Sequence, residues 1–157
     1  MSELLQAPWT IRAALLVSAA ALAISVVTDL RERRILNAVT IPALALVIGL
    51  FGTTGGWLLV KNSLTGMAVC ALPLLLAALP GWMGMGDVKL IAVAGAVAGF
   101  PGAVTVLLFV TIAGGVQAAI QFVSARLRGF SAPRYIPYAC SIAAGTLAAF
   151  LLPGPFP

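Results

Sequence analysis

Long apolar runs alternate with short polar or glycine- and proline-rich breaks along the whole chain. A helix needs about 20 apolar residues, with a range of about 17–25, to cross the hydrocarbon core of a bilayer. Glycine, proline and charged residues in the breaks are typical of helix ends. The pattern therefore predicts an all-α fold, a polytopic membrane helical bundle of about six transmembrane helices. The predicted spans are 11–28, 35–51, 58–79, 88–100, 103–123 and 136–152, of which the fourth is short.

The composition excludes an ordinary soluble domain. Apolar residues make up 62% of the chain and charged residues only 8%, whereas soluble globular domains carry about 25% charged residues. The first apolar run ends at Thr28 and Asp29 without a small-x-small cleavage site, so we interpret it as a retained span and not a cleaved signal. We expect residues 1–157 to form a single integral membrane domain in the lipid bilayer.

Lysine and arginine gather on one side of this topology. With the N-terminus outside the cytoplasm, the outer side contains only Arg12 and Lys61. The cytoplasmic side then contains Arg31, Arg33, Arg34, Lys89, Arg126, Arg128 and Arg134. This bias is the one found in membrane proteins of the cell inner (plasma) membrane, so it predicts the N-terminus outside. It also explains the net charge of +5 better than nucleic-acid binding, and we expect no nucleic-acid partner.

The residue types that the chain lacks exclude several kinds of catalytic and metal site. The chain has no histidine, which excludes Ser-His-Asp and Cys-His nucleophilic sites and histidine-ligated zinc. Cys70 and Cys140 each lie inside an apolar run, fit no metal motif, and are interpreted as small buried hydrophobic residues. We predict no metal and no cofactor, so any hydrolytic chemistry must use carboxylates.

Two of the four acidic residues stand at the edges of apolar runs. Asp29 ends the first predicted span and Asp87 begins the fourth, whereas Glu3 and Glu32 lie in a terminal tail and an arginine-rich loop. In the predicted topology both aspartates lie near the cytoplasmic membrane face. Ionisable groups in such places are costly and indicate function. The sequence does not decide whether the two carboxylates also meet laterally.

Each aspartate also has a structural interpretation. Arg33 follows Asp29 by four residues and is a possible partner at the interface. The stretch Gly84–Asp87, with its two glycines, also suits a helix start with an aspartate cap. Alternatively, the glycines let an extended substrate peptide approach the acid. Both interpretations stay open at this stage.

A carboxylate pair would form a specific chemical device. When two carboxyl groups share a site, repulsion between their charges opposes ionisation of both, so one carboxyl keeps its proton. The ionised member takes a proton from water, and the protonated member donates to a peptide carbonyl oxygen. Asp87 at a helix start and Asp29 at a helix end suggest Asp87 as the base and Asp29 as the acid, because of the helix dipole.

Glycines elsewhere indicate close helix packing. Gly95 and Gly99 are spaced as a small-xxx-small face, which lets two helices approach closely. We assign Gly114 and Gly115 a similar packing role.

The two aspartate segments resemble motifs of a known family. Asp29–Asn37 resembles the first aspartate motif of the type IV prepilin peptidases, and Gly84–Leu90 resembles their second. This resemblance implies a GxGD-class membrane aspartyl protease with Asp29 and Asp87 as catalytic residues. It further implies substrate-binding or motif-supporting roles for Gly84, Gly86, Lys89, Arg31 and Asn37.

The resemblance also implies a substrate. The expected partner is a prepilin or pseudopilin precursor, cut between its basic leader and its apolar helix at the cytoplasmic face. The chain resembles the short form associated with tight-adherence (Flp) pili. It has no cysteine-paired cytoplasmic segment, so the resemblance gives no support for N-methylation of the product. Leu36 replaces the usual proline of the first motif, and Ala139 replaces a frequent glycine, but neither touches a carboxylate.

Two other classes of membrane protein are compatible with these residues. A membrane transporter or channel subunit would use the two acids as an ion or proton site, and would place them near mid-membrane in repeated halves. The sequence shows no such repeat. A non-catalytic assembly subunit that keeps the motifs would contain the same residues as the enzyme.

Overall fold

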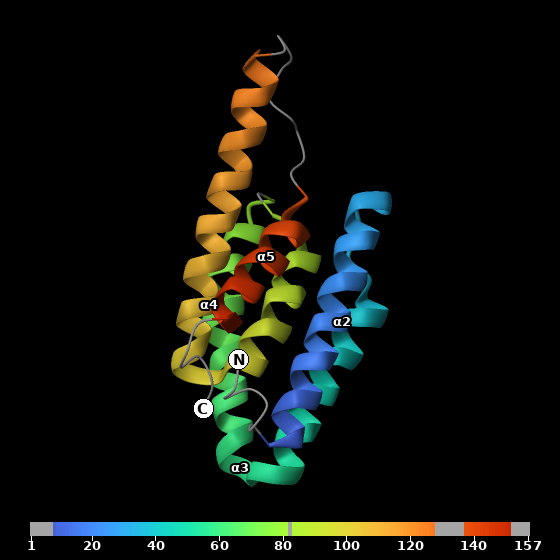
Figure 1. The fold of residues 1–157 in the computed structure, drawn as a ribbon, viewed down its shortest axis with the longest axis vertical. Helices are drawn as coiled ribbons and strands as arrows, with labels where there is room; N and C mark the ends of the chain where they lie inside the picture. Colours follow the sequence, from blue (N-terminus) through green and yellow to red (C-terminus); the bar gives the residue numbers. More distant parts are fainter. Residues whose placement is uncertain (1–7, 82, 128–136, 152–157) are drawn as a thin grey trace.

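The computed structural model describes residues 8–81, 83–127 and 137–151, and its regular elements there are all α-helices. They are α2 (Trp9–Glu32), α3 (Asn37–Ala78), α4 (Met85–Leu127) and α5 (Tyr138–Leu151). The helices run side by side along the long axis of the molecule (Figure 1). Glu3, Arg128, Arg134 and the ends of the predicted span 136–152 lie outside the described residues.

The two longest helices each double back on themselves. Gly56 interrupts α3 at φ 57°, and Gly99 with Phe100 interrupts α4, where Gly99 has φ 61°. Glycine takes such left-handed angles at little cost, which is why the chain can turn there. In Figure 1 both bends lie at the lower end of the molecule, and the two halves of each helix run antiparallel. The predicted breaks near 52–56 and 101–102 thus fall within a few residues of the observed bends.

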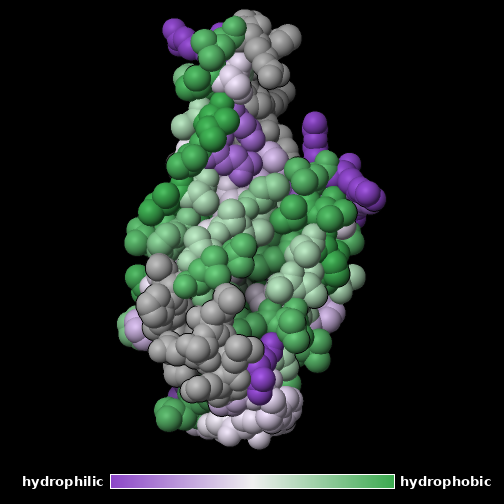
Figure 2. Space-filling view, in the orientation of Figure 1, coloured by the Kyte–Doolittle hydropathy of each residue, from purple (hydrophilic) through white to green (hydrophobic). Residues whose placement is uncertain are grey.

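The helices have the length and composition of membrane segments. Three of them, α2, α3 and α4, are long and apolar enough to cross a membrane, and α5 is a shorter apolar helix. The all-helical membrane fold is therefore confirmed. Figure 2 shows hydrophobic residues covering the middle of the visible face, with hydrophilic residues near the upper ends of α2 and α4. The six-span count and the outside N-terminus stay predictions.

The first half of α4 is the centre of the bundle. Every residue from Leu90 to Gly99 is buried, which is expected of a helix that is apolar on all sides. The surrounding helices instead turn large apolar side chains outward, where lipid would cover them. Examples are Leu16, Leu58, Leu76, Leu108 and Ile120.

The second half of α3 packs backbone to backbone against α4. A Cβ on Gly66 would collide with the carbonyl oxygen of Gly95 and with the Gly99 backbone. Across the same contact, Ser63 Oγ donates to the Ala96 carbonyl at 2.8 Å. The predicted packing role of Gly95 and Gly99 is confirmed.

Cys70 belongs to the same contact. Its thiol donates to the Ala103 carbonyl at 3.2 Å, and its side chain is fully buried. The interpretation of Cys70 as a small buried residue is therefore confirmed.

Gly66→Ala should destabilise the protein because its Cβ would meet backbone atoms that cannot move aside. We expect a loss of about 1–3 kcal/mol in the free energy of unfolding, measured by thermal or denaturant unfolding in detergent micelles. Gly49→Ala is the matched control, because a Cβ there has nothing within 4 Å. Equal changes in the two variants would contradict the assigned contact.

Candidate active site

Asp29 lies in the last turn of α2 and is only 1% exposed. The backbone N–H of Ala139, in the first turn of α5, donates to Asp29 Oδ2 at 3.4 Å. The first N–H groups of a helix have no partner within the helix, and the helix dipole there favours an anion. The start of α5 is therefore a suitable place for an ionised Asp29 carboxylate.

Asp87 lies in the first turn of α4 and is 8% exposed. Its backbone N–H donates to the Gly84 carbonyl at 3.1 Å. Its carboxylate folds back and accepts a hydrogen bond from the backbone of Gly84. This is one half of a capping box, in which an acidic side chain at the third helical position satisfies the N-cap amide. The aspartate-cap arrangement is thus present, and it orients the carboxyl group.

The two carboxyl groups come together in the structure. Asp29 and Asp87 are close enough for the charge of Asp29 to act on Asp87. The end of α2 and the starts of α4 and α5 also lie toward the same, upper end of the molecule (Figure 1). The lateral meeting that the sequence left undecided is therefore present. Two buried, neighbouring carboxyls are the arrangement that paired acid–base chemistry requires.

Residues of the two sequence motifs also contact each other directly. Lys89 Nζ donates to Asn37 Oδ1 at 2.8 Å, which joins the first turn of α4 to the start of α3. Gly86 lies against Ile35, and a Cβ on Gly86 would be 2.7 Å from the Ile35 Cβ. These two contacts hold the segment that carries Asp87 against the segment that follows Asp29.

The other predicted supporting residues lie nearer the surface. Gly84 is exposed, and a Cβ there would be 3.1 Å from Asp87 Oδ2. Arg31 is exposed in the last turn of α2, whereas Asp29 two residues earlier is buried, so the two side chains leave different faces of the helix. Arg31 therefore stands apart from the carboxylate pair.

Sequence reasoning missed the contribution of α5. The Ala139 amide reaches Asp29, and Cys140 beside it is also close enough to feel the Asp29 charge. The segment Pro137–Ala139 was noticed only as a departure from a family pattern. Asp29 thus lies at two helix ends of opposite polarity, the C-terminal end of α2 and the N-terminal end of α5.

The site offers carboxylates and backbone amides. Among the described residues, no group of three or more His, Cys, Asp or Glu side chains is arranged to hold a metal ion. In general, a pair of carboxyl groups is able to take a proton from water and to give one to a carbonyl group. This chemistry suits hydrolysis.

Gly86→Ala should destabilise the site because its Cβ would collide with Ile35. In an unfolding measurement in micelles we expect a loss of about 1–3 kcal/mol. Ile35→Gly should also destabilise the protein by itself, because Ile35 packs against the buried core. In the double variant the two losses should be less than additive, because the opposing Cβ is then absent. Fully additive losses would show that the two residues are not in contact.

Comparison with protein families gives this site a context. Among curated proteins and among solved structures, the comparisons found no match for the chain. A model of the type IV leader peptidase family matches residues 16–119, a range that includes both aspartates and all the residues that join their two segments. This match covers more than half of the chain, so the protein belongs to the type IV leader peptidase family.

Proposed function

We propose that the protein is a membrane aspartyl endopeptidase that removes the leader from type IV prepilin-like precursors, using Asp29, Asp87 and one water. The observation that carries the proposal is the pairing of two buried aspartates from helices far apart in sequence. Membership of a leader peptidase family supports a protease. Both carboxyl groups are buried, and a carboxylate is able to act as the base that activates water.

Helix ends do not separate the roles of the two acids. The Ala139 amide and the start of α5 stabilise an Asp29 anion, as the Gly84 backbone and the start of α4 stabilise an Asp87 anion. In one of the two equivalent arrangements, Asp29 is the resting base. Asp87 then keeps the shared proton, which it can donate to the carbonyl oxygen of the scissile peptide bond.

The reaction then proceeds through a tetrahedral intermediate. Asp29 takes a proton from water as the water oxygen bonds to the carbonyl carbon, while Asp87 gives its proton to the carbonyl oxygen. As the C–N bond breaks, the proton held by Asp29 passes to the leaving amine. The hydroxyl proton of the intermediate returns to Asp87, so each carboxyl ends as it began.

We place this chemistry at the cytoplasmic face of the inner (plasma) membrane, in one domain of six spans. Arg31 and Arg126 are exposed at the ends of α2 and α4, as the positive-inside rule expects for the cytoplasmic side. Trp57 follows the Gly56 bend, with Lys61 Nζ 5.5 Å from its ring centroid. Tryptophan and lysine are typical membrane-interface anchors, and they suit the opposite face.

The short central segment supports access for water. The first half of α4, residues 85–98, is about 21 Å long at about 1.5 Å per residue, compared with a hydrocarbon core of about 30 Å. Gly84 and Met85 are exposed just before the buried Asp87. A short helix that stops below the membrane surface leaves room for water and an extended peptide.

The expected substrate is a prepilin or pseudopilin precursor. The junction between its basic leader and its apolar helix lies at the depth proposed for the aspartates. A transporter with an ion or proton site is less well supported, because both acids lie in terminal turns of helices rather than at mid-helix.

Asp29→Asn and Asp87→Asn should each abolish leader removal, because each variant loses one of the two proton-transfer groups. The assay is co-expression with a prepilin-like precursor from the same cell, read as the size shift on a gel. We expect a loss of at least about 100-fold in rate, as is common for acid–base residues. Glu32→Gln, which removes an exposed acid nearby, is the control and should cleave as the wild type does.

Membrane levels of all variants must match for this comparison. Full cleavage by either well-inserted asparagine variant would overturn the two-aspartate mechanism. Failure of the wild type on a panel of such precursors would overturn the peptidase proposal.

Cleavage by the wild type should show a bell-shaped dependence on pH. On the acid side the rate falls as the base becomes protonated, and on the alkaline side it falls as the acid loses its proton. The measurement is kcat/KM for a precursor peptide in micelles across the pH range in which the protein stays folded. A rate that falls on one side only would contradict a mechanism with two carboxyls in different protonation states.

A further inference from the structure

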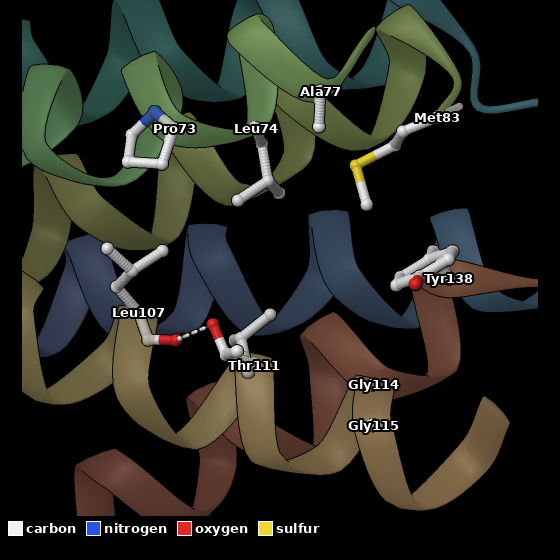
Figure 3. A pocket seen from close by; sticks show the side chains of 10 residues that line it. Pro73, Leu74, Ala77, Met83, Leu107, Thr111, Gly114, Gly115 and Tyr138 are labelled. Atoms are coloured by element: carbon white, nitrogen blue, oxygen red, sulfur yellow. Dashed lines mark hydrogen bonds between the residues drawn. The ribbon is translucent and has the colours of Figure 1, made fainter. Parts of the chain in front are cut away.

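A groove of about 250 Å³ opens between α3, α4 and α5, and neither Asp29 nor Asp87 lines it. Its walls come from the second half of α3, the second half of α4 and the start of α5 (Figure 3). Apolar side chains such as Leu74 and Leu107 line it, together with Gly114 and Gly115. Its volume is below the range of about 300–1,000 Å³ usual for small-molecule and cofactor pockets. The groove therefore suits side chains of a peptide better than a cofactor.

One end of the groove adjoins the proposed active site. Met83 and Tyr138 lie at the same end in Figure 3. Met83 directly precedes Gly84, whose backbone binds the Asp87 carboxylate. Tyr138 directly precedes Ala139, whose amide binds Asp29. The groove thus begins next to both residues that hold the carboxylates.

From there the groove follows α4 towards its bend. Leu107 and Gly114 both line it, and seven residues of helix correspond to about 10 Å, or two turns. An apolar helix lying along α4 would therefore contact it over about two turns. An occupant that fills the groove therefore lies along the bundle rather than across it.

The hydroxyl of Thr111, one of the residues that line the groove, is already hydrogen-bonded. The Thr111 hydroxyl donates to the Leu107 carbonyl of its own helix at 2.7 Å (Figure 3). At Thr111 an apolar partner therefore leaves no hydroxyl unpaired.

Gly115 leaves the groove open. A Cβ there would have nothing within 4 Å, whereas one on Gly114 would be 3.1 Å from the Tyr138 ring. The predicted helix-packing role is therefore wrong for Gly115, which faces open space. Small residues of this kind let another helix approach closely.

We propose that this groove binds the apolar helix that immediately follows the scissile bond of the substrate. The inference rests on the proposed peptidase function and adds a binding site to it. A precursor cut between the carboxylates must continue from them into the membrane. The groove is apolar, begins at the residues beside the carboxylates and runs along the helix direction, as this continuation requires.

A lipid chain is the competing occupant, but it explains less. Lipid would cover any outward apolar face of the bundle equally. This groove instead is concave, and it starts at Met83 and Tyr138, next to the groups that orient the two acids. This position is where the peptide that follows the scissile bond would pass.

The test fills the groove without touching the carboxylates. Gly115→Leu places a large side chain in the open space, and Gly49→Leu is the matched control in α3. Gly49 is also a helical glycine with nothing within 4 Å of its Cβ, and it does not line the groove. Each variant is co-expressed with a precursor that has a basic leader and an apolar helix, and the cleavage rate is measured at matched membrane levels.

We expect Gly115→Leu to slow cleavage by about tenfold, the effect of about 1.4 kcal/mol, with Gly49→Leu close to the wild type. Alanine substitutions in the first two turns of the substrate helix should partly restore cleavage by Gly115→Leu, because they remove the clashing side chains. A Gly115→Cys variant that also carries Asp87→Asn should cross-link to cysteines placed in those two turns. A Gly49→Cys variant in the same background should not.

The outcomes separate the two proposals. Equal cleavage by Gly115→Leu and Gly49→Leu, without cross-linking at residue 115, overturns the groove and leaves the peptidase intact. Slow cleavage that no substrate change restores, again without cross-links, overturns substrate binding in favour of a lipid or a local distortion. Failure of the wild type to cleave any precursor overturns the proposed function and, with it, the groove.

Discussion

The backbone contact between α3 and α4 sets the geometry of the rest of the bundle. Gly66 lies against Gly95 and Gly99, where no Cβ separates the two helices. In lipid there is little hydrophobic force between helices, so close packing and hydrogen bonds between helices must hold them together. Ser63 and Cys70 supply such bonds to carbonyls of α4. The contact keeps the first half of α4 in the centre, and the start of that segment carries Asp87 into the site.

The two aspartates depend on each other's surroundings. Asp87 is oriented by its own helix start, yet Gly86 and Lys89 beside it contact Ile35 and Asn37, which follow Asp29 in the chain. Each sequence motif therefore supplies one acid and also part of the support for the other. This arrangement makes the site a joint product of α2, α3 and α4, and α5 completes it through Ala139.

Much of this could be predicted from the sequence, because it depends on local patterns. Apolar length predicted membrane helices, and glycine and proline predicted breaks close to the bends at Gly56 and Gly99. The alternation of direction from one predicted span to the next predicted that Asp29 and Asp87 would share one depth.

What the sequence could not provide depends on contacts between distant segments. Lateral contact of the acids requires the packing order of the helices, which no local pattern records. The Ala139 amide is a backbone group, so the type of residue at position 139 does not indicate that the amide donates a hydrogen bond to Asp29. The packing role predicted for Gly115 was wrong for a similar reason. A glycine in the sequence shows that a side chain is missing, but it does not show whether another helix fills the space beside it.

The two bends also bear on how the chain enters a membrane. In the proposed topology, the segment of α4 that crosses to the outer face is Gly99–Gly102, and no charged residue lies between Lys89 and Arg126. Charged groups are the costly ones to transfer through hydrocarbon. The tip of the α4 hairpin can therefore pass the bilayer at low cost, whereas Lys61, which follows the Gly56 bend, has to cross with the tip of α3. The glycines that shape the folded protein would in this way also ease its biogenesis.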